Sequence, residues 1–164
     1  MDYSEYQLQA MKTAMELSYS SALVHGVLGV SSECGELNST IKAHAYYGKP
    51  LDLVNMSEEL GDILWFCAYL VSNENLSMTE PVRDTTERHI QHEGLVLVEA
   101  QGQLLIGGVL NLGTVHLIVD TVRRLADKYC GGIGVVMRAN ISKLQKRYPH
   151  KYSNEAAIAR ADKA

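Results

Sequence analysis

The chain has 164 residues, of which 46% are hydrophobic and 21% are charged, and its formal net charge is −4. This balance favours one domain with a substantial core and argues against a nucleic-acid-binding surface, which is normally basic. No apolar run approaches the roughly 20 residues that span a bilayer, and the polar N-terminal sequence MDYSEYQLQA does not resemble a secretory signal.

The three cysteines, Cys34, Cys67 and Cys130, are an odd number with no close pair in the sequence. Such cysteines are interpreted as reduced thiols rather than as a disulfide framework. We therefore expect a cytoplasmic protein that binds neither nucleic acid nor a membrane.

The first predicted helix begins near the N-terminus. Ser4 and Gln7 have the spacing of a capping box, in which each side chain bonds the backbone of the other residue. The helix is predicted to run to about Tyr19, because apolar residues recur at helical spacing. These residues are Tyr6, Ala10, Met11, Ala14 and Leu17.

Two more helices are predicted before the middle of the chain. One covers about 23–45 and ends at the sequence YYGKP, because glycine and proline favour a helix end. The next covers 58 to about 71, with Ser57 as its N-cap, and the sequence SNEN ends it.

The region 82–135 is harder to interpret. The sequence GLVLVEAQGQLLI fits one helix, or two strands around a turn at Gln101-Gly102, and the flanking patterns favour the helix. A further helix is predicted over 114–129, where the glycines of CGGIG end it. A last helix is predicted over about 135–147. The fold expected is all-α, a helical bundle in one domain.

Two acidic motifs, Glu33-Cys-Gly-Glu36 and Glu59-Leu-Gly-Asp62, lie on the second and third predicted helices, which form an acidic helical pair over 23–71. Residues three apart share a face of a helix, and apolar residues at core spacing flank both motifs. Four carboxylates packed together repel each other and are costly to desolvate unless cations neutralise them. The motifs therefore predict a metal site.

The chemistry of this site follows from its ligands. Carboxylate oxygens without histidine or cysteine suit Mg²⁺ or Mn²⁺ rather than zinc, and a di-iron bundle would need Glu-x-x-His motifs. A solvated helix face or an ion pair would explain one such motif alone. Two motifs on helices joined by a short loop favour the metal.

A weak internal repeat relates two parts of the chain. With a shift of 67 residues, HGVLGVSSECGEL (25–37) lies over HEGLVLVEAQGQL (92–104), and the acids of the first segment meet Ala100 and Gln103. Chance resemblance between apolar helices explains the pattern equally well. Thus 86–130 is either an insertion or a degenerate copy of the acidic helical pair, packed against it as an internal pseudo-dimer.

The order ExxE, a linker and then ExxD in EELGDILWF resembles that of the MazG-like all-α nucleoside triphosphate pyrophosphohydrolases. That superfamily includes the dimeric dUTPases and the HisE-type phosphoribosyl-ATP pyrophosphohydrolases. The sequence NISKLQKRYPHKYS also resembles its closing segment, so 135–164 is expected to form a closing helix and tail. The resemblance covers about 23–71 and 137–153. It departs at Ser32, where many members have glutamate, and at 80–134, which has no counterpart in small members.

The resemblance implies a Mg²⁺-dependent enzyme that hydrolyses a (d)NTP to a (d)NMP and pyrophosphate in nucleotide-pool control. It implies a homo-oligomer, dimeric or tetrameric, and Glu33 or Glu36 to orient or deprotonate the water. The implied metal ligands are Glu33, Glu36, Glu59 and Asp62. Two alternatives stay open: a HisE-type hydrolase or dUTPase, and a catalytically silent helical module that binds nucleotide or metal.

Substrate contacts are expected from cations and rings near these motifs. The basic candidates for the phosphates are Lys42, Lys49, Lys143, Arg147 and Lys151, although each alone is typical of a solvated surface charge. Asn140 is expected to be polar lining. The candidates for the base are His25, Trp65, Phe66 and Tyr69, although rings at this spacing more often pack in a core.

Overall fold

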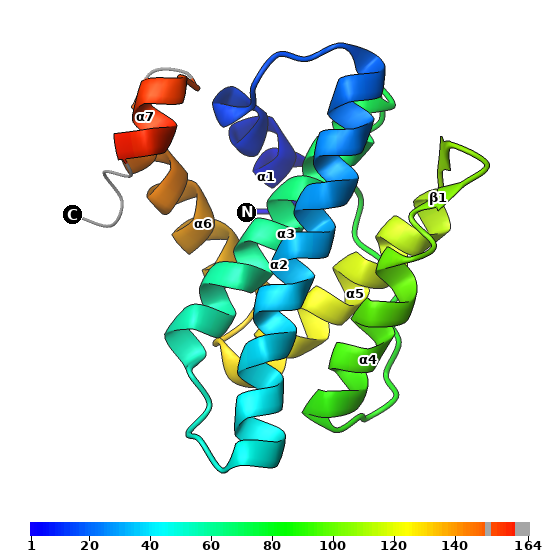
Figure 1. Ribbon diagram of the computed structural model, residues 1–164, viewed down its shortest axis with the longest axis vertical. Helices are drawn as coiled ribbons and strands as arrows, with labels where there is room; N and C mark the ends of the chain where they lie inside the picture. Colours follow the sequence, from blue (N-terminus) through cyan, green and yellow to red (C-terminus); the bar gives the residue numbers. More distant parts are fainter. Residues whose placement is uncertain (150–151, 160–164) are drawn as a thin grey trace.

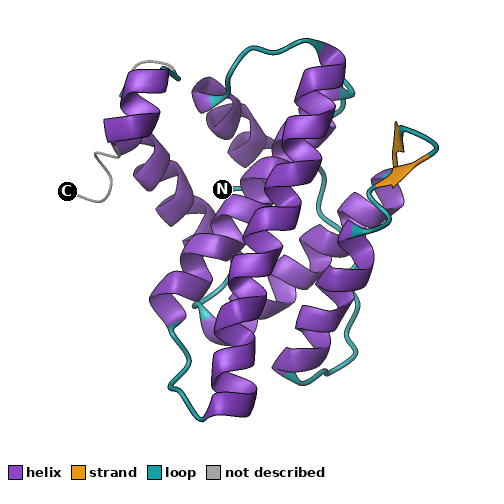
Figure 2. Cartoon of the chain, viewed as in Figure 1, coloured by secondary structure: helices purple, strands orange, loops and turns teal. Residues whose placement is uncertain are grey.

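The computed structural model describes residues 1–149 and 152–159, and this part of the chain is mostly helical, as predicted (Figure 2). The elements are α1 (Tyr3–Ala10), a 3₁₀ helix η1 (Met11–Thr13), α2 (Tyr19–Tyr47), α3 (Leu53–Asn73), α4 (Ile90–Gln101), β1 (Leu105–Ile106), β2 (Val109–Leu110), α5 (Leu112–Tyr129), α6 (Ile133–Arg147) and α7 (Asn154–Ala159).

Helix α3 lies at the centre of the molecule. It contacts α1, α2, α5 and α6, and several of its apolar side chains, among them Leu60, Ile63 and Leu64, are fully buried. Helix α2 runs beside it in the opposite direction, as Figure 1 shows, and α4 packs on α2. The acidic helical pair is therefore an antiparallel hairpin with other helices packed around it.

The first helix begins and ends earlier than the sequence predicts. Asp2 caps α1, since its carboxylate accepts the backbone N–H of Glu5 at 2.8 Å and the hydroxyl of Ser4 at 2.8 Å. The predicted capping box is wrong, because the Gln7 amide bonds Ser72 at 2.7 Å instead. The chain leaves the helix after Ala10, so the expected extension to about Tyr19 is also wrong.

The start of α3 also differs from its prediction. Its N-cap is Asp52, whose carboxylate accepts the backbone N–H of Asn55 at 3.0 Å, and Ser57 lies one turn inside the helix. The side chain of Asn55 bonds Thr40 on α2 at 2.8 Å, which holds this first turn in place. Helix α2 covers its predicted range and ends at Gly48, which has a φ of 66°.

The region 82–135 contains the predicted helices and one unexpected hairpin. Helix α4 ends at Gln101, so the favoured interpretation holds up to that residue. The strands β1 and β2 follow it, around Gly107 and Gly108, whose φ values are 60° and 82°. Two consecutive positive φ values are what a two-residue hairpin turn requires. The alternative of two strands around a turn at Gln101-Gly102 is therefore not what forms, because the hairpin lies further along the chain.

The segment 86–130 packs against the acidic helical pair, with α4 on α2 and α5 on α3. Helices α4 and α2 are close at Gly94, since a Cβ atom there would lie 2.3 Å from the Asn38 Oδ1 atom. The two stretches aligned by the 67-residue shift differ in shape. The first lies inside α2, whereas the second ends in the turn that contains Gln103. The duplication stays a prediction.

Candidate metal centre

Three carboxylates from two neighbouring helices form a cluster. Glu33 lies on α2, Glu59 and Asp62 lie on α3, and one oxygen atom from each lies within 4.8 Å of the others. Glu59 is only 6% exposed, whereas Glu33 and Asp62 are half-buried. The three-residue spacing puts the two acids of α3 on one face, and the antiparallel neighbour brings Glu33 to the same place.

The fourth predicted ligand, Glu36, lies at the edge of this cluster. Its side chain is exposed, and the three-atom group within 4.8 Å does not include it. It is still close enough for its charge to raise the pKa values of Glu33 and Glu59. Glu36 therefore lies at the solvent-exposed edge of the cluster and acts on it through its charge.

The electrostatics of the cluster are those of crowded, poorly solvated acids. Burial, a hydrogen bond with Glu33 and the neighbouring charges together raise the pKa of Glu59 to about 8, and burial is the largest of these causes. Burial and the charge of Asp62 also raise the pKa of Glu33. Without a cation the pair therefore holds a proton near neutral pH. A divalent ion bound here would release that proton.

Asp62 bonds a cation of the protein, whereas Glu33 accepts the Ser32 hydroxyl at 3.1 Å. Both oxygen atoms of Asp62 accept the Lys143 ammonium, at 2.7 and 2.6 Å, and Asn140 donates its side-chain N–H to Oδ1 at 2.8 Å. The sequence predicts these two residues as substrate contacts, and the structure places both on a predicted metal ligand. Gly61 allows the approach, because a Cβ atom there would lie 2.9 Å from Asn140.

A cavity of about 190 Å³ lies beside the cluster. Glu33 and Asp62 form part of its wall, together with four residues that the sequence predicts for substrate binding: His25, Trp65, Phe66 and Arg147. Five further residues line it that the sequence does not predict as site residues, although the last three lie in the closing segment: Thr13, Met15, Leu144, Tyr148 and Tyr152. The acids therefore border a hollow with aromatic walls.

Neighbouring groups hold the rings of this cavity in place. The Trp65 indole N–H donates to the Ala10 carbonyl and to the Thr13 hydroxyl, both at 3.2 Å. Tyr69 stacks on Trp65 with ring centroids 5.4 Å apart, and it is not among the residues that line the cavity. A Cβ atom at Gly29 would lie 2.2 Å from the Phe66 ring. The wall is therefore rigid.

His25 brings an unsatisfied polar atom to this wall. Its Nδ1 atom is buried without a hydrogen-bond partner, and its ring meets those of Phe66 and Tyr69 edge-on at 5.5 and 5.4 Å. Burial lowers the pKa of His25, so the imidazole is neutral at pH 7. A buried polar atom without a partner is a candidate for bonding a ligand.

The remaining predicted cations lie elsewhere. Lys42 on α2 and Lys49 in the next loop are exposed, and neither lines this cavity. Lys151 lies outside the described residues.

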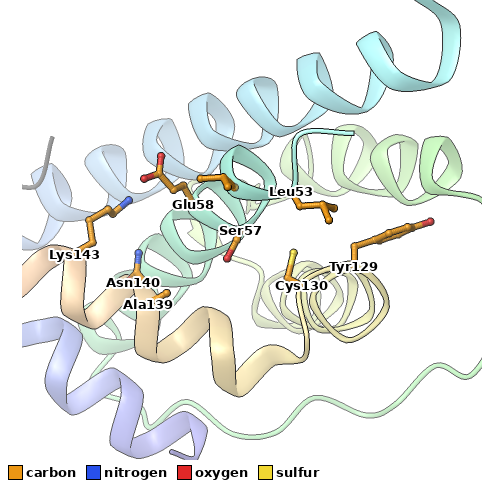
Figure 3. Close-up of a pocket in the computed structure, with 9 residues that line it drawn as sticks. Leu53, Ser57, Glu58, Tyr129, Cys130, Ala139, Asn140 and Lys143 are labelled. Carbon is orange, nitrogen blue, oxygen red and sulfur yellow. The ribbon is translucent and has the colours of Figure 1, made fainter. Parts of the chain in front are cut away.

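A second cavity, of about 520 Å³, lies between α6, the start of α3 and the end of α5. Figure 3 shows Asn140 and Lys143 entering from α6, with Ser57 on α3 and Tyr129 at the end of α5. The two side chains that bond Asp62 therefore also line this larger hollow. The larger cavity therefore borders two partners of Asp62 rather than the three acids themselves.

In the described part of the chain, no helix is both long enough and apolar enough to cross a membrane. Comparisons of the chain with known protein families, with curated proteins and with solved structures find no match. The function is therefore argued from the cluster. Its all-oxygen donor set fits Mg²⁺ or Mn²⁺, which prefer carboxylate ligands.

Proposed function

We propose that the chain is a Mg²⁺-dependent nucleoside triphosphate pyrophosphohydrolase with a MazG-like bundle. One observation carries the proposal: three carboxylates from two antiparallel helices come within 4.8 Å of one another. Their motifs match the ExxE and ExxD order of that superfamily. Acids so crowded favour a divalent cation, and a nucleoside triphosphate is a common ligand of such cations.

The reaction proposed is attack of water on the α-phosphorus. A new bond forms between the water oxygen and that phosphorus, the bond to the bridging oxygen breaks, and pyrophosphate leaves. When bound, Mg²⁺ supplies charge stabilisation and a water molecule of lowered pKa. Glu33, Glu59 and Asp62 would hold the ion, and Glu36, at the exposed edge, would take the proton of the water.

Other residues near the cluster suit the rest of the substrate. Lys143 carries a positive charge beside Asp62, and Arg147 lies in the wall of the adjoining cavity. These cations suit the phosphates. The rings of Trp65 and Phe66 suit a base, and the neutral His25 offers it a hydrogen bond. The protein would act in nucleotide-pool control as a cytoplasmic homo-oligomer.

The test is a panel of dNTPs and NTPs incubated with Mg²⁺, with products separated by chromatography. The proposal expects monophosphate and pyrophosphate from at least one nucleotide. Diphosphate and orthophosphate as primary products would place the attack at the γ-phosphorus and remove the chain from this reaction class. A preference for dUTP in this panel would point to the dUTPase alternative, and a preference for phosphoribosyl-ATP, added as a further substrate, would point to the HisE-type alternative.

A second candidate is a silent module that binds metal or nucleotide without turnover. The ion pair between Lys143 and Asp62 favours it, because that acid already has a cation of the protein as its partner. Calorimetry with a non-hydrolysable triphosphate separates the two functions. Binding without product in the whole panel supports the silent module.

A further inference from the structure

A chain of hydrogen bonds reaches Asp62 from the far end of the sequence. The hydroxyl of Tyr6, on α1, donates to Asn140 Oδ1 at 2.8 Å, and Asn140 Nδ2 donates to Asp62 Oδ1 at 2.8 Å. Tyr6 is fully buried and Asn140 is 4% exposed. The three residues belong to three different helices, α1, α6 and α3, which contact one another pairwise.

The direction of each bond in this chain is fixed by its chemistry. A carboxylate only accepts hydrogen bonds, so the amide nitrogen of Asn140 must face Asp62. Its amide oxygen then faces Tyr6, whose hydroxyl has a proton to donate. A flipped amide would set an oxygen atom against the carboxylate, and both are acceptors. The carboxylate of Asp62 therefore fixes the amide orientation of Asn140. The Tyr6 hydroxyl, whose second acceptor is the Gly61 carbonyl at 3.2 Å, holds the amide oxygen from the other side.

The chain also fixes the carboxylate itself. Oδ1 of Asp62 accepts both Asn140 and Lys143, whereas Oδ2 accepts Lys143 alone. Lys143 is a flexible side chain with rotatable donors, but Asn140 is buried and held by a rigid ring. Asn140 is therefore the partner that can set the plane of the carboxylate.

We propose that Tyr6 and Asn140 are positioning residues, which orient Asp62 as a metal ligand through this hydrogen-bond relay. The inference rests on the proposed function, because it assumes that the cluster binds a divalent cation. It goes further by giving α1 a role at the site. Partners of this kind, one step behind a metal ligand, tune metal affinity in many proteins.

The test measures Mn²⁺ affinity by calorimetry, with the full chain and no nucleotide. Tyr6→Phe keeps the ring and removes only the hydroxyl, and we expect it to weaken Mn²⁺ binding about 10-fold. Asn140→Ala removes the middle of the relay, and we expect a loss of about 10- to 100-fold. Unchanged affinity in Tyr6→Phe overturns the proposal.

A double-mutant cycle separates the relay from general packing. Because Tyr6 acts through Asn140, Tyr6→Phe should weaken binding no further in the Asn140→Ala background. Additive losses would overturn the relay, because they would mean that the two residues act independently. If Tyr6→Phe does not fold, Asn140→Ala tests the last link alone, and wild-type affinity in that variant overturns the proposal.

Tyr3 provides the matched control. It lies on the same helix, it is 7% exposed, and its buried hydroxyl has no hydrogen-bond partner. Tyr3→Phe should leave Mn²⁺ affinity unchanged, and an equal loss in both variants would assign the effect to the packing of α1 and overturn the relay. If the wild-type chain binds no Mn²⁺, the metal site itself fails and the relay falls with it. That outcome differs from binding that Tyr6→Phe leaves intact.

Discussion

Acidic side chains are buried between two pairs of helices, and the two groups of acids differ in how they are paired with cations. Between α4 and α5, Glu93 and Asp120 are 4% and 3% exposed. The Arg124 guanidinium bonds Glu93 through two nitrogen atoms, at 2.9 and 2.8 Å, and also bonds Asp120. Arg123 bonds Asp120 at 2.8 Å. Each of these two acids therefore has a guanidinium partner.

The cluster between α2 and α3 is not neutralised in this way. Three carboxylates meet there, and of these Asp62 has the ammonium of Lys143 as its partner. Burial raises the pKa values of Glu33 and Glu59, so we expect this pair to keep a proton near neutral pH. Burial of acids is therefore not by itself the sign of a site. The sign is a set of crowded acids for which the described residues supply fewer cations than carboxylates.

The largest effect is expected on turnover, if the cluster between α2 and α3 is the active site. Asp62→Asn and Glu59→Gln remove one charge each from the ion-binding group, and we expect each to lower kcat/KM by about 10²- to 10³-fold. The helical circular dichroism signal should be preserved. Glu99→Gln, at an exposed position of α4, is the control. Near-wild-type rates in both cluster variants would remove the proposed site.

The next largest effect is expected on stability, in the cluster between α4 and α5. Arg124→Met leaves Glu93 buried without its guanidinium, and we expect the free energy of unfolding to fall by about 3–5 kcal/mol. Urea denaturation measures this loss. The matched control is Arg83→Met, because its ion pair with Glu80 has side chains 65% and 57% exposed and should cost under about 1 kcal/mol. An equal loss of unfolding free energy in the two variants would mean that the buried ion pair stabilises the fold no more than the surface pair does.

A smaller effect is expected from pH on the metal-free protein. The folded pKa of Glu59, about 8, lies above its ordinary value, so the folded state holds a proton that the unfolded state loses first. Its contribution to stability is complete at low pH and is lost as the pH rises through 8. Glu59→Gln should therefore gain stability relative to the wild type between roughly pH 5 and 8, the window that the two pKa values set.

Thermal denaturation in a chelator at several pH values measures this difference. Saturating Mg²⁺ should remove the loss of wild-type stability with rising pH, because the ion binds the ionised carboxylates. A constant difference between the two proteins across this range would contradict the shared proton.

The smallest effect is expected from the paired acids on metal binding. Glu93→Gln should leave Mn²⁺ affinity within about 2-fold of the wild type, because a buried acid that is already paired with a guanidinium serves as a structural partner rather than as a ligand. Glu59→Gln is the counterpart that should lose binding. Calorimetry with Mn²⁺ measures both. A loss of affinity in Glu93→Gln would show that the two clusters are not separate.

The cluster can be predicted in large part because its signal is local. Glu59 and Asp62 are three residues apart on one helix, and Glu33 lies on the preceding helix of the same hairpin. Spacing along a helix does not measure rotation toward a neighbour. For that reason the sequence groups Glu36 with the ligands, although the structure places it at the exposed edge.

The parts that the sequence does not predict depend on distant contacts. The periodicity assigns Tyr6 to an apolar face, but its hydroxyl meets Asn140, 134 residues away. The predicted start of α3 is too late because its first turn exposes Leu53 and Val54, which gives no core pattern. The turn at 107–108 does have a local signal, a pair of glycines between apolar residues. That signal is stronger than the one at 101–102, where the alternative to the helix puts the turn.

The bond between Tyr6 and Asn140 also bears on the order in which the protein is made. During synthesis α2 and α3 leave the ribosome before α6 is made, so the three acids can meet before Asn140 and Lys143 are present. Asn140 and Lys143 are made with α6, long after Tyr6, which lies on α1. An unfinished or C-terminally clipped chain would carry the charges of the site without the groups that aim them. Nascent chains should therefore become able to bind the metal only late in synthesis, after α1 and α6 have packed together.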